Sequence, residues 1–405
     1  MTATAQDTEK HPTLRERAGN EAKHLVDSTG KIVLIDFLLG CVMVVFTYQV
    51  KGLPLAALAG FALVLIGITR KPQQSVPPMG IFIALMVLGL TWATFSSALL
   101  SQVEFFDIVR RIARITSVFL VVVFIADKRL DLRSIVLGLA AGSLVNVVAY
   151  YAGVAPDNYP GYLTGWFNDK NVAGLYYAMI AFLLFAVLKK RSHRIIALAI
   201  FSIILWETGS RTSMAALGFA VLWVLFAYRL NFFFKTFLAV GMVWTVNFLE
   251  ENFAQVGVFS ARAGSDALRG RIDAASQVKI DSAPWHGLGL STAKVQLGEH
   301  GIFFFHNSFW TLLVEAGWIY LLLIMTATIC AAFLFKQTGK KKRVLFGEGA
   351  TILIFICSWR LGEVLLTMPW GLAMGLALSL CAVPLPDKRF NRYLESLNSS
   401  TKSEQ

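Results

Sequence analysis

The chain has 405 residues, of which 56% are hydrophobic and only 15% are charged, and its mean hydropathy is +0.62. A typical soluble domain is about 25% charged, so this composition excludes an ordinary soluble globular protein and predicts an all-α polytopic membrane protein. The net charge of +12 does not by itself indicate nucleic-acid binding, since the distribution of charge decides what a surface attracts. We therefore expect membrane lipids, and no nucleic acid, as partners.

The four cysteines, Cys41, Cys330, Cys357 and Cys381, all lie in apolar runs and show no CxxC spacing. This pattern is typical of reduced packing residues, so neither a disulfide nor a metal framework is expected. Residues 1–31 are polar, whereas a signal peptide carries its apolar core near the start. We accordingly expect no cleavable signal.

Apolar runs of membrane-spanning length recur along the chain. A bilayer core of about 30 Å needs roughly 20 apolar residues per helix. On this basis we predict about twelve transmembrane helices, at 32–50, 54–69, 79–98, 112–126, 134–152, 172–188, 195–209, 213–228, 236–250, 308–335, 344–358 and 367–383. An even number of spans puts both termini on one side of the membrane.

The Lys and Arg residues of the connections predict which side that is. Five alternate connections, at 70–71, 127–133, 189–194, 229–235 and 336–343, carry 16 of them, and the five short connections of the other set carry seven. By the positive-inside bias both termini are cytoplasmic. The resulting organisation is a cytoplasmic tail (1–31), nine spans (32–250), a periplasmic loop with short helices (251–307), three spans (308–383) and a second cytoplasmic tail (384–405).

Arginines on the outward side run against this bias and need partners. Arg110, Arg111 and Arg114 open the fourth predicted span shortly after Asp107, and Arg360 follows the eleventh. The cluster at the start of the fourth span has two possible roles. It is either a solvated helix terminus with local ion pairs, or a contact for lipid head groups or an anionic substrate. The sequence assigns no role to Arg360.

The connection between the fifth and sixth predicted spans, GVAPDNYPGYLTGWFNDKN, is a turn-rich loop. Asn168 or Asp169 is expected to cap the helix that follows. Trp166 and Phe167 fit either an interfacial aromatic belt or a surface that stacks on a sugar ring.

The seventh predicted span ends in WETGSRTS. Glu207 and Arg211 are four residues apart, a spacing that would let them pair along one helical face, while Gly209 and Ser210 indicate a break between two helices. Two interpretations stay open. One is an interfacial Glu–Arg clamp, and the other is a carboxylate that orients the planar guanidinium of Arg211 for bidentate binding of a phosphate.

The periplasmic loop holds the densest set of candidate residues. The stretch DALRGRIDAASQVKI has helical character and begins with Arg269 and Arg271, although five acidic residues balance five basic ones across 251–305. PWHGLGLS follows as a tight glycine turn that lacks the features of a phosphate-binding loop. His306 and Asn307 then open the tenth predicted span, where the histidine is either structural or a general base.

The spacing of the histidines argues against zinc. His286, His300 and His306 are separated by 14 and 6 residues, which match no zinc signature, so no metal is expected. The sequence also contains no GxSxG, HExxH or Walker motif. Arginines with one well-placed histidine suit transfer from an anionic leaving group with general-base help.

At these residues the sequence resembles the O-antigen ligase and polymerase superfamily of bacterial envelope glycosyltransferases. GWFNDKN resembles the family's turn before the sixth span, and TGSRTS resembles its short Ser-Arg element. LRGRIDAASQVKIDSAPWHGLGLS resembles its periplasmic GR…P…GxG segment. His306-Asn307, nine residues and then GWIY fit the ligase pattern, so that the similarity covers about 160–320.

The resemblance implies a GT-C-like fold in the bacterial inner membrane that acts on undecaprenyl-pyrophosphate-linked glycan on the periplasmic side, with no metal or cofactor. By this resemblance Arg211 and Arg271 bind the pyrophosphate, and His306 activates the acceptor hydroxyl, with inversion at the anomeric carbon. The expected substrate-binding set is completed by Arg269, Asn307, Glu207, Asn171 and Trp166.

Three functions follow as hypotheses. The leading one is an O-antigen ligase that moves a finished glycan to a lipid A–core acceptor. A polymerase would instead use another lipid-linked glycan as acceptor. A lipid or polysaccharide transporter would bring charged residues face to face at mid-bilayer, whereas the predicted spans contain few charges, chiefly Asp36 and Glu315.

Overall fold

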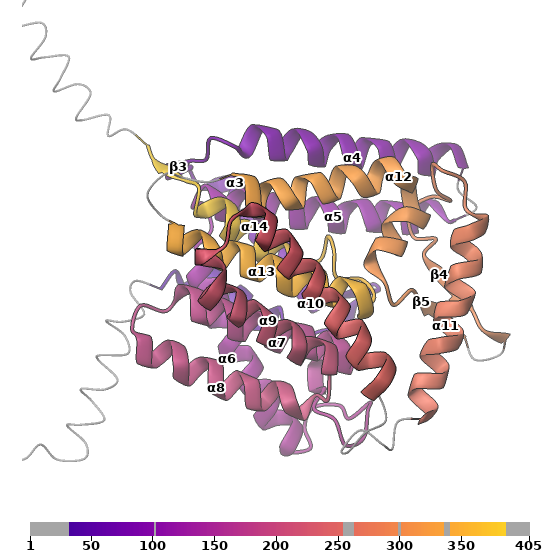
Figure 1. The fold of residues 1–405 in the computed structure, drawn as a ribbon, viewed down its shortest axis with the longest axis horizontal. Coiled ribbons are helices and arrows are strands. Elements are labelled where there is room, and N and C mark those ends of the chain that lie inside the picture. The colour runs from indigo at the N-terminus through magenta and orange to yellow at the C-terminus, as the bar shows by residue number, and fades with distance from the viewer. Residues whose placement is uncertain (1–31, 101–102, 254–262, 299–300, 336–340, 386–405) are drawn as a thin grey trace, which may run out of the picture.

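The computed structural model describes residues 32–100, 103–253, 263–298, 301–335 and 341–385. These residues are 72% helical and contain thirteen α-helices. Strands form three short antiparallel pairs within the described chain. Figure 1 shows the helices gathered into one bundle.

In chain order the α-helices are α2 (Leu34–Val42), α3 (Leu55–Thr69), α4 (Met79–Leu100), α5 (Phe105–Ala126), α6 (Leu132–Tyr151), α7 (Lys170–Val187), α8 (Arg191–Glu207), α9 (Arg211–Phe226), α10 (Phe232–Phe253), α11 (Ala263–Ser282), α12 (Ser308–Ile329), α13 (Lys341–Arg360) and α14 (Met368–Ser379). The paired strands are β1 (Gln49–Val50) with β2 (Leu53–Pro54), β3 (Gln74–Ser75) with β6 (Val383–Pro384), and β4 (Lys294–Gln296) with β5 (Ile302–Phe304).

The helices of the described chain are those of a membrane protein. Five stretches are long and apolar enough to cross a bilayer, namely Met79–Leu99, Leu132–Tyr151, Lys170–Val187, Arg211–Arg229 and Ser308–Leu334. Shorter apolar helices occupy Leu55–Thr69, Phe233–Met242 and Met368–Ser379. Each predicted span contains a helix, but the total of twelve membrane crossings stays a prediction.

The first predicted span, 32–50, is wrong in its extent. Its helix α2 has nine residues, which at 1.5 Å per residue rise only about 14 Å, less than half of a bilayer core. The chain then reverses at Lys51 and Gly52, whose φ angles of 49° and 77° form the turn of the β1–β2 hairpin. A Lys-Gly pair supplies such a turn because glycine adopts positive φ without steric cost.

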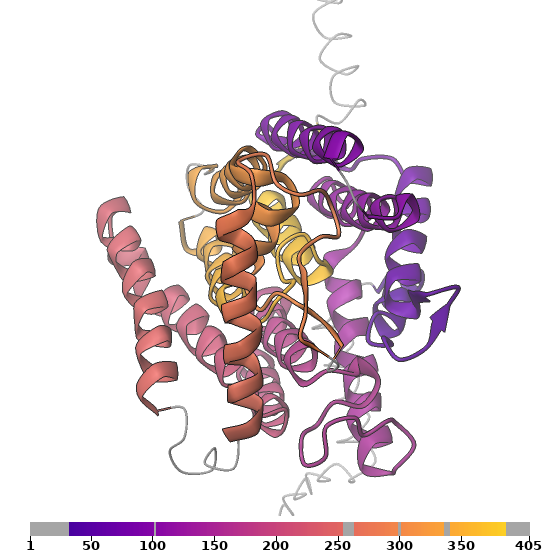
Figure 2. The same ribbon diagram turned by 90° about the vertical axis from the view of Figure 1, so that its right-hand side faces the viewer.

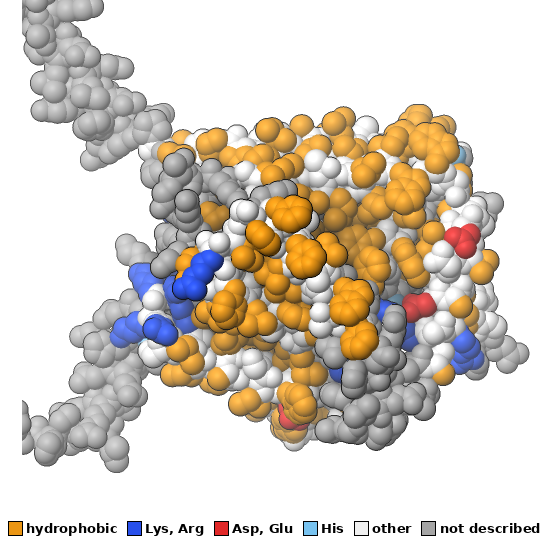
Figure 3. All heavy atoms as spheres, viewed as in Figure 1, with side chains coloured by type: hydrophobic (Ala, Val, Ile, Leu, Met, Phe, Trp, Pro, Cys, Tyr) orange, Lys and Arg blue, Asp and Glu red, His pale blue; other side chains and the backbone are white. Residues whose placement is uncertain are grey.

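Both ends of the described chain lie at the same end of the bundle. The amide of Val33 donates to the hydroxyl of Ser134 (2.9 Å), and Gln74 in β3 lies opposite Pro384 in β6. In Figure 3 Lys and Arg side chains gather at this end, on the left, while apolar side chains cover the middle of the molecule. A chain that crosses a bundle an even number of times has both of its ends on the same side.

The opposite end carries α11, β4 and β5, and Figure 2 looks onto it. There α11 lies across the ends of the spanning helices instead of running along them. A small apolar cluster of Ile272, Val295, Phe305 and Val314 joins α11 to the hairpin and to α12. In the described residues of the predicted loop, 263–298 and 301–307, the structure has one helix of 20 residues and a hairpin where short helices were expected.

Helix α12 is broken in its third turn, where Gly317 has a φ of 74°. The PWHGLGLS segment docks into this break. The amide of Leu288 donates to the carbonyl of Val314 (2.7 Å), and the amide of Trp318 donates to the carbonyl of Trp285 (3.1 Å). The docked segment thus satisfies backbone groups that the broken helix leaves without their usual partners.

Glycine is required on both sides of this contact. A Cβ on Gly317 would collide with the carbonyl oxygen of Trp285 and with the backbone of His286. A Cβ on Gly287, whose φ is 85°, would lie 2.6 Å from the backbone nitrogen of Ala316. Two backbones therefore approach more closely here than any side chain would allow.

Gly317→Ala is expected to lower the free energy of unfolding by about 2–4 kcal/mol, because alanine resists positive φ and its Cβ meets backbone that has no room to move. Unfolding of the purified protein in detergent measures the effect. Gly218→Ala in α9, where a Cβ meets nothing within 4 Å, is the matched control and should be neutral or slightly stabilising. Equal stability of the two variants would contradict the docking described above.

Candidate functional site

His306 lies in the short connection between β5 and α12, with its imidazole facing α11. Its Nδ1 lies 3.5 Å from Oδ1 of Asp273, and the two side chains are 24% and 28% exposed. This Nδ1 is buried and has no closer hydrogen-bond partner. A carboxylate beside one imidazole nitrogen leaves the other nitrogen, Nε2, available to a substrate. Sequence reasoning missed Asp273.

Arg269 and Arg271, which were both expected to bind substrate, lie on different faces of α11. Ile272 is buried against the hairpin, and Arg269 precedes Asp273 by four residues, so that these two share one side of the helix. Arg271 is exposed and projects from a different face, about 200° around the helix from Asp273. Arg269 is therefore the arginine on the Asp273 side, although the family resemblance favoured Arg271.

Lys279 fixes the position of α11 against β4. Its ammonium donates to the carbonyls of Thr292 (2.7 Å) and Lys294 (2.9 Å). Burial, together with the nearby charge of Lys294, lowers the pKa of Lys279. These contacts and the apolar cluster hold Asp273 in place beneath His306.

Asn307 serves as the N-cap of α12 and is only 5% exposed. Its Oδ1 accepts from the amides of Phe309 (2.9 Å) and Trp310 (3.2 Å). The next residue, Ser308, donates its hydroxyl to the carbonyl of Gly362 and accepts from a backbone amide of the same turn. The expected substrate-binding residue therefore has a structural role, which is to fix the start of α12 directly after His306.

Glu207 and Arg211 do not share one helical face, because they belong to two different helices. Helix α8 ends at Glu207, Gly209 has a φ of 61°, and Arg211 is the first residue of α9. The predicted break between two helices is confirmed. The carboxylate of Glu207 accepts a hydrogen bond from the hydroxyl of Tyr151 (3.2 Å), so that it ties α8 to α6.

Arg211 nevertheless lies at the end of the molecule that carries the histidine. Ser213, in the first turn of α9, lies close to the thiol of Cys357 near the end of α13. The turn after α13 then contacts the start of α12, because a Cβ on Gly362 would lie 2.9 Å from the carbonyl oxygen of Phe305. The starts of α9 and α12 and the end of α13 thus converge.

The GWFNDKN turn joins several elements through its backbone. The carbonyl of Trp166 accepts from the amide of Phe46 (2.8 Å), and its own amide donates to Oδ1 of Asn146 (2.7 Å). Asp169 caps α7 by accepting from the amide of Asn171 (2.7 Å), which confirms one of the two expected caps. The indole nitrogen of Trp166 is buried and has no hydrogen-bond partner in the described chain. The stacking of Trp166 on a sugar ring stays a prediction.

Tyr159 in the same loop donates its hydroxyl to Oδ2 of Asp169 (3.0 Å). Burial and the Asp169 carboxylate raise the pKa of Tyr159 to about 12. Lys170 lies over the rings of Tyr159 and Tyr162, at 5.7 and 4.9 Å from their centroids. The loop is consequently a packed structure that holds the start of α7 at this end of the bundle.

The arginines in the first turns of α5 separate into two kinds. Arg110 is 53% exposed and pairs weakly with Asp107 (3.5 Å), as the solvated-helix interpretation predicts. Arg111 is 4% exposed and bonds Glu315 of α12 and Glu363 of the turn after α13, each at 3.0 Å. For Arg111 the local interpretation is wrong, because both partners lie more than 200 residues away in sequence.

Metal ligands do not gather in the described part of the chain: no group there contains three His, Cys, Asp or Glu side chains in suitable positions. His286 contacts the carbonyl of Gly287 through Nδ1 (3.1 Å). His300 lies outside the described residues.

Arg111→Leu is expected to lower the free energy of unfolding by about 3–5 kcal/mol, because it leaves the buried carboxylate of Glu315 without its guanidinium partner. Arg110→Ala, one residue away on the exposed face, should cost less than about 1 kcal/mol. Chemical denaturation of both variants in the same detergent compares them. If Arg111→Leu is as stable as Arg110→Ala, the Arg111–Glu315–Glu363 network contributes nothing to the fold.

The candidate site therefore consists of His306 and Asp273, with Arg269 on the same side of α11 and with Arg211 and the buried Arg111 network at the same end of the molecule. It combines an imidazole beside a carboxylate with several guanidinium groups. Neither the comparison with protein-family models nor that with curated proteins finds a match for this chain.

Proposed function

We propose that the protein is an inverting, metal-independent membrane glycosyltransferase of the O-antigen ligase type. It transfers a glycan from undecaprenyl pyrophosphate to a lipid A–core acceptor at the periplasmic face of the bacterial inner membrane. The observation that carries the proposal is the pairing of His306 with Asp273 at 3.5 Å, directly before the start of α12. The resemblance of the surrounding motifs supplies the identity of the donor.

In the proposed reaction Nε2 of His306 accepts the proton of the acceptor hydroxyl. The oxygen then attacks the anomeric carbon as the bond from that carbon to the pyrophosphate oxygen breaks, and attack from the opposite face inverts the configuration. Asp273 orients the ring and stabilises the imidazolium that forms. The distance of 3.5 Å exceeds that of a direct hydrogen bond, and such contacts commonly shorten once substrate binds.

The arginines supply the second half of this chemistry. Arg211 and Arg269 are assigned to the departing pyrophosphate, where a planar guanidinium pairs two oxygens at once. Their positive charge matches the negative charge that develops as the bond breaks. Arg271 is exposed on another face of α11, and we assign it to the outer part of the donor.

The positions of the buried ion pairs favour an enzyme over a transporter. Arg111 lies in the second turn of α5, near the end of the bundle that carries α11. Asp36, which pairs with Arg70 (2.8 Å), lies toward the other end, where α2 begins. A transporter would be expected to bring such charges together near the middle of the bilayer.

His306→Ala is expected to lower the rate of glycan transfer by about 10²–10⁴-fold, since a positioned base typically contributes that much. Asp273→Asn should lower kcat by about tenfold or more with little change in KM, because the carboxylate of Asp273 orients the imidazole of His306 without touching the substrate. Transfer assays in membranes or proteoliposomes measure both rates.

The matched control is Asp281→Asn on the same helix, whose carboxylate accepts from Gln277 (2.8 Å) and lies on the exposed surface. Its transfer rate should equal that of the wild type. Normal transfer by His306→Ala would overturn the proposed role of the base.

Incubation with lipid-linked donor alone separates a ligase from a polymerase. We expect no product until a lipid A–core acceptor is added, because the proposed acceptor is not a second donor molecule. Gel separation of the labelled glycans gives the answer. A ladder of longer lipid-linked glycans from donor alone would establish the polymerase instead.

A further inference from the structure

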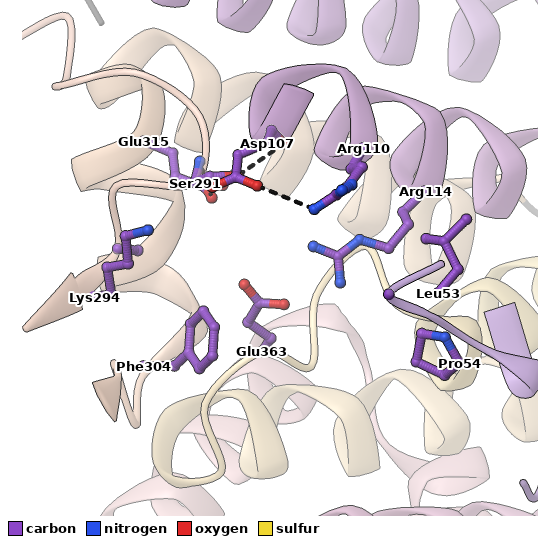
Figure 4. A pocket seen from close by; sticks show the side chains of 12 residues that line it. Leu53, Pro54, Asp107, Arg110, Arg114, Ser291, Lys294, Phe304, Glu315 and Glu363 are labelled. Carbon is purple, nitrogen blue, oxygen red and sulfur yellow. Dashed lines mark hydrogen bonds and ion pairs between the residues drawn. The ribbon is translucent and has the colours of Figure 1, made fainter. Parts of the chain in front are cut away.

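A cavity beside the histidine connection is lined by charged side chains that the proposed mechanism does not use. It has a volume of about 200 Å³ and lies between the first turns of α5, the β4–β5 hairpin, the tip of the β1–β2 hairpin and the turn after α13. Figure 4 shows Arg110 and Arg114 on one wall and Lys294 with Phe304 on the other.

The lining contains three cations and three carboxylates, but two of these carboxylates, those of Glu315 and Glu363, are paired with the buried Arg111, which is not part of the lining. Asp107 pairs with Arg110, and Glu363 bonds the buried Arg111 at 3.0 Å. Neither Arg114 nor Lys294 forms an ion pair with a carboxylate of the described residues, and both side chains belong to the lining. Two cations on opposing walls therefore face a space of the size of one small ligand, which favours a ligand with an anionic group.

Phe304 gives the cavity one apolar wall. Its side chain is 61% exposed although large aromatic residues are usually buried, and it lies directly opposite Lys294 in the hairpin register. An exposed aromatic ring offers a flat surface to the C–H face of a pyranose. The carboxylate of Glu363, 25% exposed and directed into the cavity in Figure 4, can accept from sugar hydroxyls.

The cavity also lies close to the proposed base. Phe304 precedes His306 by two residues, so their Cα atoms are at most about 7 Å apart, which is roughly the length of one sugar unit. A saccharide held against Phe304 would therefore place a neighbouring unit within reach of the imidazole.

We propose that this cavity binds a sugar unit that carries one anionic group, a phosphate or a carboxylate, in one of the two glycans of the transfer reaction. Arg114 and Lys294 bind the anionic group, Phe304 stacks on the ring, and Glu363 accepts from a hydroxyl. The inference rests on the proposed function for its connection to transfer, but the binding itself is measurable without any turnover.

The test uses the full-length protein in detergent and the probes glucose 6-phosphate, glucuronate, glucose and inorganic phosphate, with binding followed by saturation-transfer NMR or calorimetry. Glucose 6-phosphate and glucuronate should bind at least tenfold more tightly than glucose or inorganic phosphate. Arg114→Gln and Lys294→Gln should each weaken binding of the two anionic sugars at least fivefold, because each removes a charge-assisted hydrogen bond.

Lys51→Asn is the matched control, since it removes a cation from the neighbouring hairpin tip, lies outside the lining, and replaces a residue at φ 49° with one that tolerates this conformation. It should bind the anionic sugars as the wild type does. His306→Ala should also bind them normally, so that loss of transfer and loss of this binding are separate results.

Equal affinity for glucose and the anionic sugars would overturn the inference, as would full binding by both glutamine variants. Inorganic phosphate that binds as tightly as glucose 6-phosphate would show a simple anion site without sugar recognition. The last experiment tests nanodiscs that contain phosphatidylglycerol as competitors of glucose 6-phosphate. If this lipid, but not phosphatidylcholine, displaces glucose 6-phosphate from the wild type, the cavity is a lipid head-group site and the inference fails.

Discussion

The contact between the PWHGLGLS segment and the break in α12 is the constraint on which the end of the molecule that carries α11 depends. A helix that stops and restarts inside a bundle leaves amides and carbonyls without their helical partners, at a cost of about 1–3 kcal/mol each when buried. Here the amide of Gly289 donates to the carbonyl of Glu315 (3.0 Å), and the indole N–H of Trp92 donates to the carbonyl of Ala316 (2.8 Å). The fit holds because Gly317 and Gly287 leave no Cβ in the way.

This contact determines where the charged side chains lie. Ser291, just after the docked turn, donates its amide to Oε1 of Glu315 (3.0 Å), so that the carboxylate keeps Oε2 for Arg111. The same segment continues into β4, which carries Lys294 and pairs with the strand that leads to His306. His306, the buried ion network and the wall of the cavity are therefore linked through this segment and its contacts, and a site of fixed geometry needs such support.

Patterns that act over a few residues could be predicted from the sequence. The helices at 54–69, 79–98 and 134–152, the break at Gly209 and the cap at Asp169 all follow from local composition and turn chemistry. The helix expected over 32–50 ends at Val42, and the amides of Phe46 and Thr47 then donate to the carbonyl of Trp166, a distant partner that the apolar run does not reveal.

Partners that are distant in sequence could not be predicted in this way. Asp273 precedes His306 by 33 residues, and Glu363 follows Arg111 by 252. Only the four-residue spacing of Arg269 and Asp273 carried a signal, because it indicates a shared side of α11 while Arg271 lies elsewhere. The helical period of 3.6 residues therefore distinguishes Arg269 from Arg271, although both are close to Asp273 in the sequence.

The long separation within the Arg111 network has a consequence for synthesis of the chain. Residues 315 and 363 emerge from the ribosome 204 and 252 residues after Arg111, or on the order of 10 to 50 seconds later at about 5–20 residues per second. During that interval neither carboxylate partner of Arg111 has been made, and an unpaired arginine costs about 2.5–3.5 kcal/mol at the centre of a bilayer and less toward its surface. We therefore expect the start of α5 to take up its final position only after α12 and the turn after α13 have been made.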